Sequence, residues 1–346
     1  MRKVPDRLSF DMVIVFPLLI FAVGVSFLIK GADWLVEGAS SMARRLRVSD
    51  LVIGLTVVSF GTSAPELLVN IIASMQGSAD IAIGNIVGSN ISNTLLILGT
   101  TALIMPLAIK RSTVIKEIPF SLLAAGVLYI MANDALFGGD EISKLSMGDG
   151  LVFLGFFIIF IYYTFGMQKT ELEEDDSHTK TILSLRKAIW LVLIGLVGLT
   201  LGGKLCVQTA QEIALTLGVS EALVGLTAVA IGTSLPELTA SLVAALKHKP
   251  DISIGNIVGS NIFNIFWILG LSSVIKPLPF RPELNVDLLM VFFSAVLLFV
   301  IIHNGGVHRR LFFWWRQKRD YILNRWEGGI LVCCYVAYIA FVAWRG

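Results

Sequence analysis

The stretch DIAIGNIVGSNISN at residues 80–93 returns as DISIGNIVGSNIFN at residues 251–264, and only two positions differ between the copies. A second motif precedes each copy: GTSAPE at residues 61–66 and GTSLPE at residues 232–237. All four segments keep one offset of 171 residues, without a gap. A fixed offset of this kind indicates an internal duplication, so the chain contains two copies of one structural unit.

The composition excludes a soluble protein. Hydrophobic residues make up 55% of the 346 residues, and charged residues only 15%, against about 25% in ordinary soluble domains. The polar surface is too small to cover a globule of this size in water, which leaves the class of polytopic membrane proteins. The net charge of +2 is too small for a nucleic-acid partner, and the three cysteines form neither a disulfide framework nor a zinc spacing.

We expect ten transmembrane helices, because ten apolar stretches are long enough to cross about 30 Å of hydrocarbon. The predicted fold is therefore all-α and polytopic. The candidate spans are residues 12–40, 51–75, 80–105, 114–132, 149–168, 187–217, 222–246, 252–275, 286–303 and 329–344.

The duplication divides these spans into two halves of five. Because five is odd, the second half must enter the membrane in the opposite orientation, which makes the two copies inverted repeats. In transporters of this design the substrate site lies near the midplane, on helices that are locally broken. The predicted organisation is a first repeat at 1–168 (motif region 54–99), an acidic connector at 169–186, and a second repeat at 187–346 (motif region 225–270).

The basic residues of the loops predict the orientation. With the amino terminus outside, the cytoplasmic loops contain eighteen Lys and Arg residues and the external segments contain seven. Positive residues concentrate on the cytoplasmic side of membrane proteins. We therefore expect both termini to be external and the connector to be cytoplasmic.

Two glutamates are the strongest candidates for chemistry. Glu66 and Glu237 lie within apolar spans, where a carboxylate costs about 2.5 to 3.5 kcal/mol on insertion scales and is rarely retained for stability. Each follows a proline that cannot donate a hydrogen bond, which leaves backbone carbonyls at membrane depth without a helical partner. Hydroxyl groups occur in the same turns, at Thr62, Ser63, Thr233 and Ser234. Oxygen ligands without nitrogen or sulfur indicate a site for a hard cation.

The longer motif adds a polar stripe to each half. Its members are spaced i, i+4, i+8, which places them on one helix face. They are Asn85, Ser89 and Asn93 in the first half and Asn256, Ser260 and Asn264 in the second. Together with the glutamates they could supply the 6 to 8 oxygens that calcium takes, and sodium, which has a similar radius, would compete for them.

Structural roles remain open for several of these positions. The small residues Gly84, Gly88 and Ser92 recur at four-residue spacing, as in close helix packing. The prolines could be ordinary kinks, and any single asparagine could join two helices. The paired glutamates fit such roles less well, since the same carboxylate recurs in both copies.

These residues resemble a known family. The two copies are similar to the alpha-repeats of the cation/calcium exchanger superfamily, specifically the sodium/calcium exchanger branch in its prokaryotic form. The resemblance covers nearly the whole chain and rests on GTSxPE twice and GNxxGSNxxN twice. It implies antiport of sodium against calcium by alternating access in a plasma (inner) membrane. It further implies a monomeric functional unit that is not an enzyme and needs no cofactor, Ca²⁺ and Na⁺ being the transported ions.

The family pattern also implies a set of ligands, transferred residue by residue. The ligands are the carboxylates of Glu66 and Glu237, the side chains of Thr62, Ser63, Thr233, Ser234, Ser89, Asn93, Ser260 and Asn264, and the carbonyls of Ser59 and Ala230. Position 264 is an aspartate in potassium-dependent relatives and in some prokaryotic ones, and an asparagine here. The resemblance therefore argues against potassium dependence and gives the site two negative charges instead of three.

Three functions are alternatives to sodium/calcium exchange. An intramembrane hydrolase would need a base near Ser63 or Ser234, and all four histidines fall in loops or at helix ends. A channel could use the same oxygens without coupling two ions. A proton/calcium exchanger, or an exchanger of another divalent cation, is the nearest alternative, because both glutamates can bind protons.

Two peripheral segments predict little about transport. The acidic run at 171–176 is too short for a calcium-sensing domain and is expected to be a solvated connector. The basic, aromatic segment at 309–325 is typical of a stretch that lies on membrane lipid at the inner leaflet.

Overall fold

The computed structural model describes residues 7–137, 142–166, 183–217, 232–311 and 321–345, and within them the chain is almost entirely helical. The α-helices are α1 (Arg7–Leu46), α2 (Asp50–Ile53), α3 (Ser59–Thr62), α4 (Ala64–Gln76), α5 (Ala79–Ile91), α6 (Leu98–Ile104), α7 (Ile118–Met131), α8 (Asp134–Phe137), α9 (Met147–Gly166), α10 (Leu185–Thr216), α12 (Leu235–Leu246), α13 (Pro250–Ile262), α14 (Gly270–Ile275), α15 (Asn285–Leu311) and α16 (Arg325–Arg345).

Wider π-helical turns interrupt several of these helices, and four short strands complete the described structure. The π-helical segments are η1 (Gly54–Val58), η2 (Ser92–Ile97), η3 (Thr113–Glu117) and η5 (Phe263–Leu269), and η6 (Pro282–Leu284) is a 3₁₀ turn. The strands are β1 (Leu107–Ile109), β2 (Lys144–Leu145), β3 (Leu278–Pro279) and β4 (Tyr321–Leu323).

The described residues confirm a polytopic helical membrane protein. They contain eight helices that are long and apolar enough to cross a bilayer, and a ninth if the bent pair Asp50–Thr62 and Ala64–Gln76 is counted as one span. The predicted span at 222–246 is described only as α12, because 218–231 fall outside the described residues. The count of ten therefore stays a prediction.

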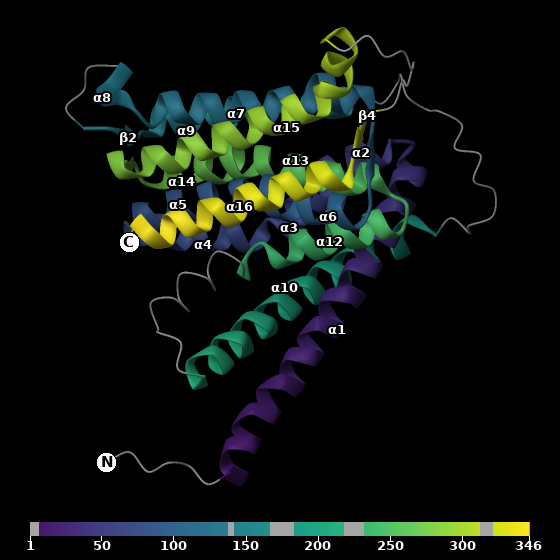
Figure 1. The fold of residues 1–346 in the computed structure, drawn as a ribbon. Coiled ribbons are helices and arrows are strands. Elements are labelled where there is room, and N and C mark those ends of the chain that lie inside the picture. Colours follow the sequence, from purple (N-terminus) through teal and green to yellow (C-terminus); the bar gives the residue numbers. More distant parts are fainter. Residues whose placement is uncertain (1–6, 138–141, 167–182, 218–231, 312–320, 346) are drawn as a thin grey trace.

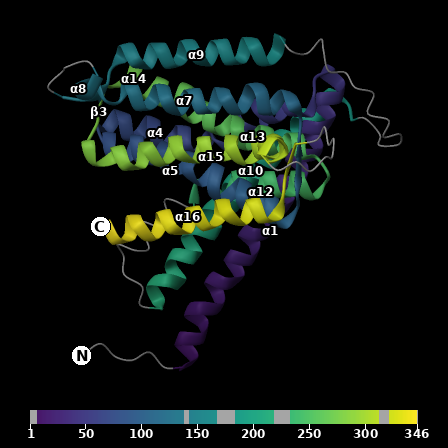
Figure 2. The ribbon, with the colours of Figure 1, turned by 45° about the horizontal axis from the view of Figure 1, so that its top comes forward.

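Two long helices stand apart from the others. Most helices run side by side in a bundle, whereas α1 and α10 lie together and extend obliquely away from it (Figures 1 and 2). Their contact depends on glycine, since a Cβ atom at Gly195 would lie 2.7 Å from the carbonyl oxygen of Gly31. Only residues without a side chain allow two helix backbones to approach this closely.

The short strands exchange between the two halves. β1 pairs antiparallel with β4, and β2 pairs antiparallel with β3. In both pairs, a strand that follows the motif helix of one half joins the strand that precedes the last span of the other half. The two pairs lie at opposite ends of the bundle, with β4 on the right and β2 on the left in Figure 1. Two copies related by a pseudo-two-fold axis produce such a reciprocal arrangement.

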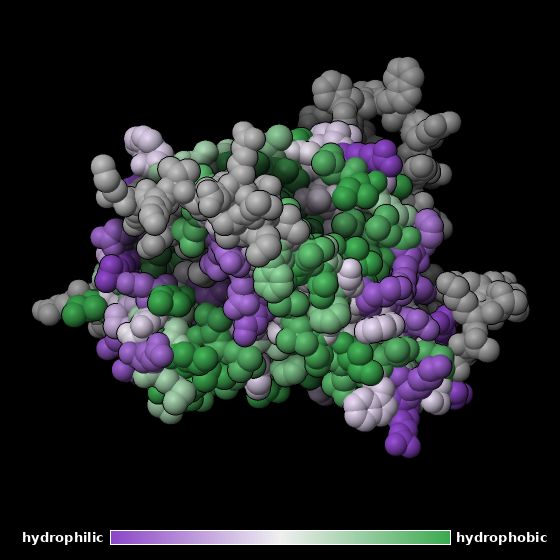
Figure 3. Space-filling view, turned by 90° about the horizontal axis from the view of Figure 1, so that it is seen from below, coloured by the Kyte–Doolittle hydropathy of each residue, from purple (hydrophilic) through white to green (hydrophobic). Residues whose placement is uncertain are grey.

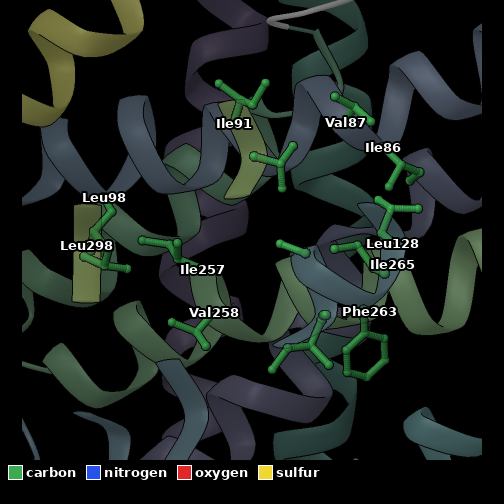
Figure 4. Close-up of a cluster of buried hydrophobic side chains, with 14 of the residues drawn as sticks. Ile86, Val87, Ile91, Leu98, Leu128, Ile257, Val258, Phe263, Ile265 and Leu298 are labelled. Atoms are coloured by element: carbon green, nitrogen blue, oxygen red, sulfur yellow. The ribbon is translucent and has the colours of Figure 1, made fainter. Parts of the chain in front are cut away.

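The motif helices form the centre of the apolar core. Ile86 and Ile91 of α5 and Ile257 of α13 are fully buried, and they belong to one cluster with side chains of α6, α7, η5 and α15 (Figure 4). Close packing holds the second motif helix in place, because a Cβ atom at Gly255 would lie 2.9 Å from the carbonyl oxygen of Leu51. At Gly84 and Gly88, by contrast, no described atom lies within 4 Å of such a Cβ.

The distribution of polarity is the reverse of that in a soluble protein. Large apolar side chains such as Ile158 of α9 and Val197 of α10 are more than half exposed, while glutamates and asparagines are buried. Green apolar side chains cover much of the face shown in Figure 3, and purple side chains gather toward its two ends. An apolar girdle around a polar interior is the surface that a bilayer solvates.

Candidate ion-binding site

Glu66 lies where a helix is broken, and Glu237 lies just after the start of α12. Ser63, with φ −84° and ψ 7°, separates α3 from α4, and the chain bends by 48° there. Pro65 occupies the first turn of α4 and cannot donate to the preceding turn, which explains why the break falls at this point. The prediction of a locally broken helix is confirmed in the first half. In the second half α12 begins at Leu235, again with proline in its first turn.

Each carboxylate lies in the first turn of a helix, Glu66 in α4 and Glu237 in α12. Glu66 and Glu237 are both 1% exposed. The positive end of the helix dipole favours a carboxylate at this position. This effect is small compared with the cost of burying an ionised group, so the burial requires a further explanation.

Hydroxyl groups from both halves surround the two carboxylates. Ser89 donates to Glu66 Oε1 at 3.5 Å, and Ser63, from the first half, donates to Glu237 Oε1 at 3.3 Å. The contacts also cross in the other direction, since the Thr233 hydroxyl interacts with Glu66. Thr62 interacts with Glu237.

Six of the predicted ligands present a buried oxygen that has no hydrogen-bond partner among the described residues. We call this set the central oxygen cluster; it consists of Glu66 Oε2, Glu237 Oε2, Asn93 Oδ1, Asn264 Oδ1, Ser234 Oγ and Ser260 Oγ. A buried polar atom without a partner costs about 1 to 3 kcal/mol, and more when it is charged. Oxygens without a partner also occur elsewhere among the described residues, as at Ser74 and Ser253, but these six belong to the repeated motifs of both halves and are of the kind that a hard cation would satisfy.

The first asparagine of each stripe braces the broken helix. Asn256 Nδ2 donates to Ser241 Oγ at 2.9 Å and lies 3.5 Å from the backbone oxygen of Glu237. Asn85 makes the equivalent bonds in the first half, to Asn70 Oδ1 at 2.7 Å and to the backbone oxygen of Glu66 at 3.4 Å. These two members of the stripes therefore connect the motif helix to the glutamate helix within each half.

Of the two predicted carbonyl ligands, the structure describes only that of Ser59. Ser59 is fully buried, its hydroxyl donates to the Gly54 carbonyl at 2.6 Å, and its own carbonyl accepts the Ser63 N–H at 2.9 Å. Ala230 lies outside the described residues. Thr233 is only partly buried, in contrast to Thr62.

A change of helix type accompanies the last asparagine of each motif. η2 begins at Ser92 and η5 begins at Phe263, one residue before Asn93 and Asn264 respectively. π-helical turns inside α-helices are frequent at functional sites, because the wider turn redirects side chains.

Sequence reasoning missed one further pair, Asn90 and Asn261. Both are buried, and they join α5 to α13: Asn90 Nδ2 donates to the Asn261 carbonyl at 3.3 Å, and Asn261 Nδ2 donates to Thr94 Oγ1 at 2.8 Å. They stand one position off the polar stripe, so helical spacing did not select them. Their recurrence in both copies of GSN was the available signal.

Comparison with known proteins finds relatives that match both halves of the chain. The family model described as "Sodium/calcium exchanger protein" matches residues 16–166 and 187–344. The sodium/calcium exchanger MaX1 of Methanosarcina acetivorans is 32% identical over 93% of this chain and 97% of its own length. The inner membrane protein YrbG of Escherichia coli is 36% identical over 74% of this chain and 78% of its own length.

The same relationship holds for solved structures. The sodium-calcium exchanger NCX_Mj superposes with a TM-score of 0.77 and 33% sequence identity, over 94% of this chain and 99% of that one. MaX1 and NCX_Mj are exchangers, which are transporters and not enzymes. With the duplicated motifs, the paired glutamates and the shared helical fold, the chain belongs to the sodium/calcium exchanger family.

Proposed function

We propose that the protein exchanges sodium for calcium by alternating access, and that both ions bind at the central oxygen cluster near the membrane midplane. The observation that supports this most directly is the set of buried oxygens without partners, contributed by both halves. A hard cation satisfies such oxygens and compensates the burial of the two carboxylates.

Charge counting favours calcium as one of the ions. Glu66 and Glu237 together provide two negative charges, which one Ca²⁺ neutralises. The other cluster members are neutral amides and hydroxyls, which can coordinate a cation without adding charge. Sodium ions fit the same oxygen ligands, so a pocket with two carboxylates allows one calcium to be replaced by several sodium ions.

The relatives support the same pair of ions. MaX1 and NCX_Mj are both sodium/calcium exchangers, and each matches more than nine-tenths of this chain. Asn264, in place of the aspartate found in potassium-dependent relatives, further favours exchange without potassium.

Alternating access needs two similar halves that face opposite sides of the membrane. We propose that these are the repeats 1–168 and 187–346, joined by the connector 169–186. The reciprocal strand pairs at opposite ends of the bundle support this arrangement. The start of α1 and the end of α16 point toward the same end in Figure 1, in keeping with an even number of spans. We place both termini outside an inner membrane and assign the function to a single chain.

The test is uptake of radioactive calcium by vesicles that contain the purified protein. The vesicles are loaded with sodium, with potassium or with acid, and uptake is compared at zero membrane potential. We expect uptake only from the sodium-loaded vesicles. Uptake driven by acid would show a proton/calcium exchanger instead, and uptake without any counter-ion gradient would show a channel.

A further inference from the structure

The amide of Asn264 could face the central oxygen cluster in two ways. An asparagine side chain has an oxygen at one end and an NH₂ group at the other, and only the oxygen can bind a cation. The two orientations occupy nearly the same space, so packing does not choose between them. Asn264 is 1% exposed, so water does not choose either.

Hydrogen bonds make the choice, starting from a backbone carbonyl. Asn90 Nδ2 lies 3.3 Å from the backbone oxygen of Asn261. A carbonyl oxygen only accepts hydrogen bonds, so Asn90 must turn its NH₂ group toward it. The Oδ1 of Asn90 then points the other way.

A second hydrogen bond, between Asn90 and Asn264, then fixes the orientation of the Asn264 amide. Asn264 Nδ2 donates to Asn90 Oδ1 at 2.9 Å, across 174 residues of sequence. Because the NH₂ group of Asn264 is used here, its Oδ1 occupies the opposite end, where it has no partner among the described residues. The Asn261 carbonyl, which can only accept, therefore determines through Asn90 that the free end of the Asn264 amide is its oxygen.

The repeat counterpart of Asn90 does not bond to a backbone carbonyl in the same way among the described residues. Asn261, the repeat counterpart of Asn90, donates to the hydroxyl of Thr94 at 2.8 Å. A hydroxyl can donate or accept, so it does not impose a direction. The counterpart of Thr94 in the second half is Ile265, which offers no hydroxyl to Asn90.

We propose that Asn90 is a positioning residue for ion binding: it orients Asn264 so that an oxygen, and not an NH₂ group, faces the ions. The inference rests on the proposed function and names a residue outside the predicted ligand set. It also explains how a neutral amide can serve at position 264.

The experiment measures sodium-driven calcium uptake in vesicles for five proteins: the parent, Asn90→Leu, Asn264→Asp, the double variant of these two, and a control. Leucine matches asparagine in size and cannot accept a hydrogen bond. A carboxyl group has oxygen at both ends, so a protein with Asn264→Asp does not need an orienting partner. Asn261→Leu is the matched control, because it removes the same kind of side chain and leaves the Asn261 carbonyl in place.

We expect Asn90→Leu to raise the KM for calcium about tenfold, the loss of one orienting hydrogen bond, with Vmax within about twofold of the parent. In the Asn264→Asp background, Asn90→Leu should not raise KM, because the carboxylate faces Asn90 Oδ1 oxygen to oxygen and loses no hydrogen bond when Asn90 is replaced. Asn261→Leu should leave the KM of the parent unchanged. If Asn90→Leu does not give folded protein, Asn90→Ala provides the same comparison.

An unchanged KM in Asn90→Leu would overturn the positioning role, and so would an equal rise in both backgrounds, because that indicates general damage to the helix crossing. A fall in Vmax alone would likewise contradict it. A parent protein that takes up no calcium would instead overturn the proposed function, which this design tests separately.

Discussion

Thr62 and Asn256 are 194 residues apart in the sequence, and the hydroxyl of Thr62 donates to Asn256 Oδ1 at 3.0 Å. The same asparagine braces the helix of Glu237 through its NH₂ group. Asn256 therefore supports the helix of Glu237, and Thr62 of the first half orients Asn256. The first half thus contacts the glutamate of the second half directly, through Ser63, and supports its helix through Thr62 and Asn256.

Neutralising either glutamate should abolish calcium transport. In Glu66→Gln or Glu237→Gln, calcium would be only half neutralised in a buried site, at a cost of about 3 kcal/mol or more, which is over 100-fold in affinity. Both variants should still insert and remain folded, because glutamine has nearly the same shape. Uptake assays with size-exclusion chromatography as the folding control test this. Robust uptake by either variant would refute the assignment of the two carboxylates as ligands.

Sodium and calcium should compete for one site. We propose one shared site for both ions, so occupancy by sodium should exclude calcium. Calcium binding measured at increasing sodium concentrations should show a rising apparent Kd and an unchanged number of sites. A plateau, beyond which added sodium no longer displaces calcium, would instead show that the two ions bind separately.

Asn264→Asp should introduce sensitivity to potassium or to pH. The parent site has a charge of −2, which one calcium ion balances, so transport should proceed without potassium. A third potential negative charge creates an excess that an additional monovalent cation or a proton would balance. Sodium-driven calcium uptake is measured for both proteins with and without potassium, across a pH series.

Two results would contradict this account of position 264. A parent protein that requires potassium would show that Asn264 does not confer independence from it. Two proteins that both ignore potassium and pH would show that this side chain does not face the ions.

The connector should be cytoplasmic. A protein with Glu173→Cys, from which Cys206, Cys333 and Cys334 have been removed, should resist a membrane-impermeant thiol reagent in intact cells and react after lysis. Lys144→Cys is the control, since the same orientation puts this position outside. Labelling at position 173 from the external side would reverse the orientation proposed from the basic residues.

Close contact between α1 and α10 should be sensitive to a single methyl group. A Cβ atom at Gly195 would lie 2.7 Å from the backbone nitrogen of Leu35, so Gly195→Ala must separate the helices, at about 1 to 3 kcal/mol. Gly155→Ala in α9 is the control, because no described atom lies within 4 Å of its Cβ. Thermal unfolding in detergent should show a lower Tm for Gly195→Ala only. Equal Tm values would mean that the helices can adjust.

The sequence predicted the features that depend on local pattern. Apolar length predicted eight of the spans to within about six residues at each end, and the inverted-repeat design predicted a locally broken helix, which is found at Ser63. It could not predict contacts between distant segments, such as the bond from Asn264 to Asn90, because helical spacing describes one face of one helix. The π-helical turns at Ser92 and Phe263 were also not predicted, since no residue type in these stretches distinguishes i+5 from i+4 bonding.

The exchange of strands between the halves has a consequence for how the protein is made. When the first five spans have left the ribosome, β1 and β2 have no partners, because β4 and β3 have not yet been synthesised. Until the second half has been synthesised, the backbone N–H and C=O groups of β1 and β2 therefore lack their strand partners. The two halves expressed as separate polypeptides should associate, each supplying the missing strands of the other, in the way that two identical ancestral subunits would have formed a dimer.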